Sequence, residues 1–183
     1  MQSNKWGAHA WEFFHTITFN YPLKPSYEIK EQNRHFFENI RHILPCNICK
    51  ESFTFFYEHI PIDYFLDDRN GVVYWLYVMH NIINLKLGYN TVNLKYVILK
   101  YENNRAKCGN IDTTNLEKIK ECQDKKKWNE EMENFYINTI NKYQNYMVKK
   151  ISNIIKKYKN RQEIVNIKYT LKKLCKKNIT LDL

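Results

Sequence analysis

Residues 44–49 read Leu-Pro-Cys-Asn-Ile-Cys, and residues 75–84 read Trp-Leu-Tyr-Val-Met-His-Asn-Ile-Ile-Asn. The first stretch contains a Cys-x-x-Cys pair, Cys46 and Cys49, whose sulfurs lie about one helical turn apart and are close enough to form a disulfide. A helix N-terminus lowers the pKa of a cysteine thiol. Pro45 is typical of a helix start, because its φ is fixed and it has no N–H to donate. These residues predict a redox-active pair at the start of a helix.

The same spacing also occurs in half of a zinc site. A complete zinc site needs two further ligands, but neither a second Cys-x-x-Cys nor a His-x₃₋₅-His follows Cys49. We therefore assign no metal ligands. A redox-inert, zinc-binding or structural helical module remains the alternative function.

The second stretch places polar side chains in an otherwise apolar helix. His80, Asn81 and Asn84 stand at positions i, i+1 and i+4. Polar groups inside a helix bundle need hydrogen-bond partners. A bound polar cofactor would supply them.

Apolar residues recur with helical spacing through most of the first hundred residues. The expected helices cover 4–20, 26–44 with Ser26 as N-cap, and a third segment that carries both cysteines and ends before Pro61. A fourth follows the loop at 67–71 and ends at Gly88, and a short fifth begins at the cap Thr91. Aromatic residues make up 15% of the chain, against only 4 Gly and 4 Pro. The sequence thus predicts an all-α fold: a four-helix bundle with a short fifth helix, in which a cofactor would lie between helices.

The charge is unevenly distributed along the chain. Residues 1–140 hold 17 Lys+Arg and 17 Asp+Glu, whereas residues 141–183 hold 12 and 2 and so carry the whole net charge of +10. We expect two units: residues 1–103, and a basic helical extension of unknown role at 104–183, with helices over 132–158 and 163–177. Its lysines form a solvated face or dock on an acidic protein, and nucleic acid is an unlikely partner because no recognition motif accompanies the charge.

Five cysteines, at positions 46, 49, 108, 122 and 175, cannot all pair within the chain. No signal peptide and no apolar run of membrane-spanning length is recognisable. A cytosolic or organellar thiol-redox protein is therefore expected rather than a secreted disulfide scaffold.

These motifs together resemble the ERV/ALR family of FAD-linked sulfhydryl oxidases, helical-bundle flavoproteins that pass electrons from thiols to oxygen. The resemblance covers residues 4–103 and rests on the order and spacing of four motifs. They are Gly7-x₃-Trp11-x₃-His15, Tyr21-Pro22, Pro45-Cys46-x-x-Cys49 and Trp75-x₄-His80-Asn81-x-x-Asn84-x-Lys86-Leu87-Gly88. The short N-terminus and the composition rich in Asn, Lys and Ile resemble the versions found in large DNA viruses.

The resemblance implies an FAD-dependent thiol oxidase that forms disulfide bonds in protein substrates and reduces O₂ to H₂O₂. It makes Cys46 the sulfur that exchanges with incoming thiols and Cys49 the sulfur nearest the flavin ring. Lys86 would lie near the pyrophosphate, and Tyr101 falls where the family commonly has a Trp near the cofactor. The implied cofactor-binding residues are Gly7, Trp11, His15, Tyr21, Trp75, His80, Asn81, Asn84, Lys86 and Tyr101.

The family also implies partners. They are a thiol-containing protein substrate, such as a thioredoxin-like carrier, O₂ as electron acceptor, and a second copy of the chain. The first two helices carry Phe13, Phe14, Phe19, Phe36 and Phe37. These are more large apolar residues than one face can bury, so we expect a homodimer through these helices. The implied location is the host cytoplasm or the virion for a viral protein, and otherwise the mitochondrial intermembrane space or another oxidising compartment.

Two departures from the family pattern stand out. Tyr77 and Leu94 occupy positions where many members have a second disulfide. No shuttle Cys-x-x-Cys or Cys-x₄-Cys follows the bundle, and we expect Cys108 and Cys122 to be a structural pair or free thiols. Because the implied cofactor residues end at Tyr101, residues 104–183 are expected to be dispensable for cofactor binding.

Overall fold

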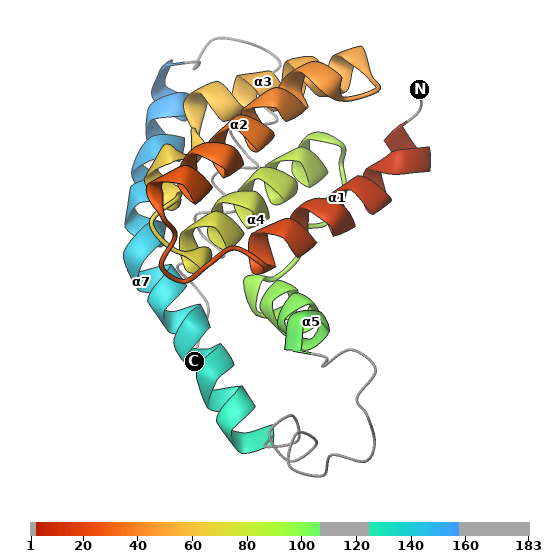
Figure 1. The fold of residues 1–183 in the computed structure, drawn as a ribbon. Coiled ribbons are helices and arrows are strands. Elements are labelled where there is room, and N and C mark those ends of the chain that lie inside the picture. The colour runs from red at the N-terminus through yellow and green to blue at the C-terminus, as the bar shows by residue number, and fades with distance from the viewer. Residues whose placement is uncertain (1–2, 107–124, 158–183) are drawn as a thin grey trace.

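The computed structural model describes residues 3–106 and 125–157, and every regular element in these ranges is a helix. Figure 1 shows α1, α2, α3 and α4 running alongside one another, with α5 at the lower end and the long α7 along one side. The elements are α1 (Ser3–Phe19), α2 (Tyr27–Ile43), α3 (Asn47–His59), the 3-10 helix η1 (Ile62–Phe65), α4 (Arg69–Lys86), α5 (Leu94–Ala106) and α7 (Lys125–Lys157). The predicted all-α fold, with four bundle helices and a short fifth, is confirmed.

Local sequence signals set most helix ends. The Ser26 hydroxyl accepts a hydrogen bond from the backbone N–H of Ile29, and the Asp68 carboxylate accepts one from Gly71. Gly88 follows the end of α4 with φ +79°, a conformation in which glycine is favoured. Ser26, the cap signal at 67–71 and the Gly88 terminus were all predicted.

The start of α5 was predicted wrongly. The helix begins at Leu94, and the Asn93 side chain accepts a hydrogen bond from the backbone N–H of Lys95 at 2.7 Å. Thr91 does not cap it, because the side-chain amide of Asn81 binds both the N–H and the carbonyl of Val92, at 2.8 and 3.1 Å. These two bonds hold the segment before α5 in a non-helical path.

Helix α4 forms the centre of the core. Its buried residues include Trp75 and Leu76, which have no exposed surface. The Trp75 indole N–H donates to the carbonyl of Ile60 at 2.8 Å, so the buried ring leaves no unsatisfied donor. Tyr21 is also buried, and its hydroxyl donates to the carbonyl of Leu66 at 2.8 Å. Both side chains attach the loop regions beside η1 to the bundle.

The apolar residues that suggested a dimer lie mostly in this core. Phe19 and Phe37 are buried, and Phe14 and Phe36 pack against the buried cluster. Only Phe13 of the five is largely exposed, at 57%. The homodimer therefore stays a prediction that rests on the family resemblance, and light scattering of the purified protein would decide it.

Helix α7 packs on the bundle. It contacts α4 and α5, and its Tyr143 and Met147 belong to the core cluster with 4% and 2% exposure. The predicted boundary after residue 103 also falls inside α5, which continues to Ala106. The division into residues 1–103 and 104–183 stays a prediction, and the described part of the second unit contacts the first. Cys108, Cys122, Cys175 and the helix predicted over 163–177 lie outside the described residues.

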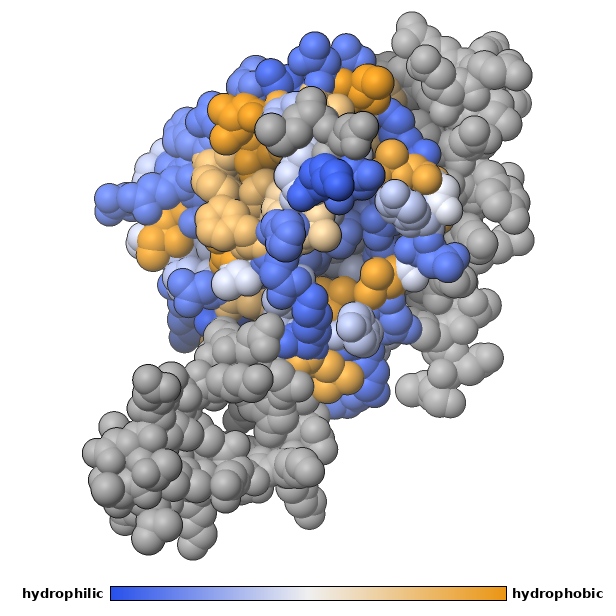
Figure 2. All heavy atoms as spheres, turned by 90° about the vertical axis from the view of Figure 1, so that its right-hand side faces the viewer, coloured by the Kyte–Doolittle hydropathy of each residue, from blue (hydrophilic) through white to orange (hydrophobic). Residues whose placement is uncertain are grey.

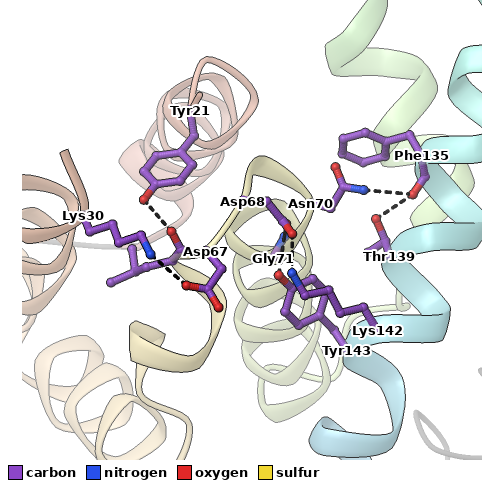
Figure 3. A network of polar contacts seen from close by, with 11 residues as sticks. Tyr21, Lys30, Asp67, Asp68, Asn70, Gly71, Phe135, Thr139, Lys142 and Tyr143 are labelled. Carbon is purple, nitrogen blue, oxygen red and sulfur yellow. Dashed lines mark hydrogen bonds and ion pairs between the residues drawn. The ribbon is translucent and has the colours of Figure 1, made fainter. Parts of the chain in front are cut away.

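The contact between α7 and α4 is centred on Asp68 (Figure 3). One carboxylate oxygen accepts from the Gly71 N–H at 2.8 Å and the Tyr143 hydroxyl at 3.0 Å. The other pairs with the Lys142 ammonium group. The side-chain amide of Asn70 donates to the carbonyl of Phe135 at 3.5 Å. Polar contacts thus fix α7 against the first turn of α4. None of the helices in the described part of the chain is long and apolar enough to cross a membrane.

Candidate active site

The cysteine pair lies at the N-terminus of α3. Cys46 is the N-cap residue, with extended backbone dihedrals, and its sulfur accepts a hydrogen bond from the backbone N–H of Cys49 at 3.3 Å. Cys49 lies in the first turn, and both thiols are free and half-buried. This placement confirms the predicted pair at a helix start.

The two thiols differ in acidity. A hydrogen bond from the Cys49 thiol lowers the pKa of Cys46, and the backbone N–H of Cys49 adds to the effect. Burial raises the pKa of Cys49 to about 11, and its hydrogen bond to Cys46 acts in the same direction. Cys46 is therefore the sulfur that more readily becomes a thiolate, which is the reactive form in disulfide exchange.

Cys49 borders a cavity of about 420 Å³ between α1, α3 and α4. This volume lies within the ~300–1,000 Å³ typical of small-molecule sites. The wall is mainly aromatic and aliphatic, with Lys86 as the one charged side chain among the described lining residues. The other lining residues are Ser3, Asn4, Trp6, Gly7, Ala8, Ala10, Trp11, Phe14, Leu44, Ile48, Ser52, Phe53, His80, Ile83, Asn84, Leu87 and Tyr89. Figure 2, which views the molecule from the right-hand side of Figure 1, shows apolar side chains gathered among hydrophilic ones.

Polar groups on the wall suit a ligand that carries a negative charge and a hydrogen-bond acceptor. Lys86 reaches across the cavity from α4, and its ammonium group donates to the Ser52 hydroxyl of α3. The indole nitrogen of Trp6 is buried and has no hydrogen-bond partner within the described residues. A ligand acceptor would satisfy this donor, and a phosphate would suit Lys86.

A second, smaller cavity has a volume of about 90 Å³, and His80 borders both cavities. The His80 ring stacks on Trp11, with ring centroids 4.1 Å apart, and its Nδ1 atom lies 3.0 Å from the Nε2 atom of His15. His15 in turn stacks on Tyr101 at 4.8 Å. Glu12 accepts hydrogen bonds from the Tyr101 hydroxyl at 3.0 Å and from Lys100 at 2.6 Å. One packed aromatic group therefore joins α1, α4 and α5.

The structure brings together most of the predicted site residues. The large cavity is lined by Gly7, Trp11, Cys49, His80, Asn84 and Lys86, and the small one by His15, His80, Asn81 and Tyr101. Cys46 adjoins Cys49 but does not line either cavity. Tyr21 and Trp75 lie in the core and border neither cavity. Asn81 is also placed differently from the expectation, because its amide is bound to Val92.

Sequence reasoning missed several lining residues, among them Trp6 and Ser52. Ser52 lies three positions after Cys49, a spacing that places two side chains on the same face of a helix. This spacing was a usable signal. Trp6 shares the apolar periodicity of α1, and periodicity does not distinguish a residue that faces the core from one that lines a cavity.

Buried histidines make the stability of the protein dependent on pH. Burial lowers the pKa of His15 to about 3 and that of His80 to about 4, with further lowering by nearby Lys100. Between these values and the usual ~6.5, the unfolded chain binds protons that the folded chain does not. The free energy of unfolding should therefore fall as pH drops below ~6.5, by up to about 1.4 kcal/mol per pH unit for each histidine.

Urea denaturation of the ligand-free protein between pH 7 and pH 5 measures this dependence. His15→Phe should roughly halve the slope, because one of the two groups is removed. A free energy of unfolding that stays constant over this range would contradict the burial of neutral histidines.

The Erv1 / Alr family model matches residues 8–105. The chain is 32% identical over 89 residues to the probable FAD-linked sulfhydryl oxidase R368 of Acanthamoeba polyphaga mimivirus, covering 48% of this chain and 62% of that protein. It is 29% identical over 82 residues to the mitochondrial FAD-linked sulfhydryl oxidase ERV1 of Saccharomyces cerevisiae, covering 44% and 42%. The chain thus spans less than two thirds of the length of either relative.

The fold is similar to the crystal structure of the FAD binding domain of Erv1 from Saccharomyces cerevisiae. The TM-score is 0.52 at 23% sequence identity, covering 55% of this chain and 94% of that one. At this identity the likeness shows a shared helical fold. Helix α7 lies beyond the residues that the family model matches.

Proposed function

The chain belongs to the Erv1 / Alr family, and from this premise we propose that it is an FAD-dependent thiol oxidase that forms disulfide bonds in protein substrates. One observation carries the proposal. A Cys-x-x-Cys pair stands at a helix N-terminus, and its second sulfur borders a cavity of about 420 Å³ whose wall carries aromatic rings and Lys86. The names of the two relatives support the same activity.

The cavity residues suit FAD by their chemistry. The stacked rings of Trp11 and His80 offer aromatic surface for an adenine, Asn84 offers an amide for a ribose, and Lys86 offers a cation for the pyrophosphate. Bound FAD would take an electron pair from the reduced cysteines and deliver it to O₂, giving H₂O₂. The protein's own share is to place the sulfurs, set their acidity and limit the access of water.

Disulfide exchange at Cys46 would bring electrons into the pair. A substrate thiolate attacks the Cys46 sulfur of the oxidised pair, and the bond to Cys49 breaks, with Cys49 leaving as a thiolate. A second substrate thiolate then attacks the substrate sulfur of this mixed disulfide, and Cys46 leaves. The substrate gains a disulfide, and the pair gains two electrons. The lowered pKa of Cys46 favours its departure, and Lys86 favours the charged form of Cys49 against the effect of burial.

We propose a thiol-containing protein as the substrate and O₂ as the acceptor. A mimivirus relative and a mitochondrial relative support action in the host cytoplasm or virion, or in an oxidising compartment such as the mitochondrial intermembrane space. A zinc-binding module is the less favoured function, because the described residues contain no group of three or more His, Cys, Asp or Glu side chains that would hold a metal.

The purified protein should therefore be yellow, with absorbance near ~450 nm and about one FAD released per chain on denaturation. It should consume O₂ and form H₂O₂ when given a dithiol. The measurements are the absorption spectrum, cofactor analysis after denaturation and an oxygen electrode. A colourless preparation that contains zinc would overturn the proposal.

A further inference from the structure

We propose that Phe135 of α7 is a positioning residue for the cofactor site. Helix α7 lies outside the residues 8–105 that the family model matches. Phe135 borders neither of the two cavities and would act through a stack of side chains behind them. The inference rests on the proposed function, because the ligand concerned is FAD.

The stack begins with the contact between α7 and α1. The Phe135 ring packs against Phe19, with centroids 6.2 Å apart and planes inclined by 19°. Phe19 stacks on Tyr101 of α5 at 5.3 Å, and Tyr101 stacks on His15 at 4.8 Å. Phe19, Tyr101 and His15 are all buried, whereas Phe135 is partly exposed. Phe135 is thus the outermost ring of this stack.

The inner end of the stack reaches the large cavity. His15 and His80 share a hydrogen bond of 3.0 Å, and His80 stacks on Trp11 with planes only 7° apart. His80 and Trp11 both line the large cavity, where we place part of the cofactor. A shift of Tyr101 or His15 would therefore move or hydrate the surface that the cofactor contacts, because buried side chains are close-packed.

Contacts on both sides fix Phe135 itself. Its carbonyl accepts the hydrogen bond from Asn70 of α4 (Figure 3), and Glu133 nearby pairs with Lys95 of α5 at 2.9 Å. Farther along α7, Lys142 and Tyr143 bind Asp68. Helix α5 packs between α1 and α7, so α7 limits how far α5 can move from the histidines.

The test compares Phe135→Ala with Met147→Ala in the full chain. Met147 is a buried residue of the same helix that is not part of the stack, so both changes remove apolar packing from α7. Phe135→Ala should raise the FAD dissociation constant by roughly ten-fold, as expected for the loss of one aromatic contact. Met147→Ala should change it less than about two-fold. Phe135→Tyr keeps the ring and should bind FAD as tightly as the wild type does. Phe135→Leu removes the ring but keeps an apolar side chain, so it replaces the alanine variant if that variant does not fold. It should also raise the FAD dissociation constant.

A second measurement does not need FAD. In the ligand-free wild type, the NMR signals of the His15 ring should not titrate above pH 5, since burial lowers its pKa to about 3. In Phe135→Ala they should titrate between pH 5 and pH 7, because water reaches the stack, while Met147→Ala should behave as the wild type. If the wild type binds no FAD, the proposed function fails, and this titration still tests the role of Phe135. Equal effects of Phe135→Ala and Met147→Ala on both readouts would overturn the inference.

Discussion

Cys46→Ser and Cys49→Ser are each expected to reduce dithiol oxidation by about three orders of magnitude or more, because a hydroxyl cannot form the disulfide through which electrons pass. Both sulfurs belong to one unit, so the double variant should be no slower than either single variant. The rate of O₂ consumption with a small dithiol measures the effect. Glu51→Ala, an exposed change on the same helix, is the matched control and should keep the wild-type rate.

The two single variants should differ in the reactivity of the sulfur that remains. Burial, the main cause of the raised pKa of Cys49, persists in Cys46→Ser, and the backbone N–H of residue 49 still donates to the Cys46 sulfur in Cys49→Ser. Alkylation at neutral pH, followed by mass spectrometry of the peptide, should therefore be faster at Cys46 in Cys49→Ser than at Cys49 in Cys46→Ser. Faster alkylation of Cys49 would reverse the roles that we assign to the two sulfurs. Substantial turnover by either variant would contradict the proposed electron path.

Gly71→Ala should be strongly destabilising, although alanine usually favours a helix. A methyl group at Gly71 would overlap the carbonyl oxygen of Phe65 and would lie 2.6 Å from the hydroxyl oxygen of Tyr143. The first of these is backbone and cannot rotate away. Overpacking of this kind costs roughly 1–3 kcal/mol or more, which exceeds the ~0.5–1 kcal/mol that alanine gains over glycine in a helix. Chemical denaturation should show the loss as a lower midpoint.

Gly7→Ala is the matched control for this change. Gly7 also lies in a helix, and a methyl group there would have nothing within 4 Å. Its free energy of unfolding should stay unchanged or rise by up to about 1 kcal/mol. If Gly71→Ala were as stable as Gly7→Ala, the close packing of η1, α4 and α7 around Gly71 would be wrong.

Sequence patterns predicted the fold and much of the site because both depend on local signals. Helical periodicity and the caps at Ser26 and Asp68 act within a few residues of the helix ends that they set. The start of α5 was missed because Asn81, on the preceding helix, holds Val92 through its side chain. A contact between different elements leaves no periodic trace in the sequence.

The surface on which α7 packs could not be predicted for a related reason. The apolar positions of 132–158 were recognised as one face of a helix, but a periodic face does not indicate which surface covers it. The partner surface includes Gly71, whose missing side chain makes room for Tyr143. Positive charge is the most distinctive feature of residues 141–183 in the sequence, whereas Tyr143 and Met147 within this range pack in the core. A motif also does not distinguish a cofactor contact from a core residue. Tyr21 and Trp75 belong to motifs that predict cofactor binding, but their side chains lie in the core and donate hydrogen bonds to backbone carbonyls there.

Asp68 binds both α4 and α7, and this affects how the protein unfolds. The same carboxylate caps the first turn of α4 and holds Lys142 and Tyr143 of α7. Fraying of that turn would carry the carboxylate away from α7, and departure of α7 would leave the turn without two of the contacts that order it. The energies of these interactions are consequently not additive, because each depends on the others. Local opening in this region should be cooperative, so that the middle of the long helix α7 and the start of α4 behave as a single folding unit.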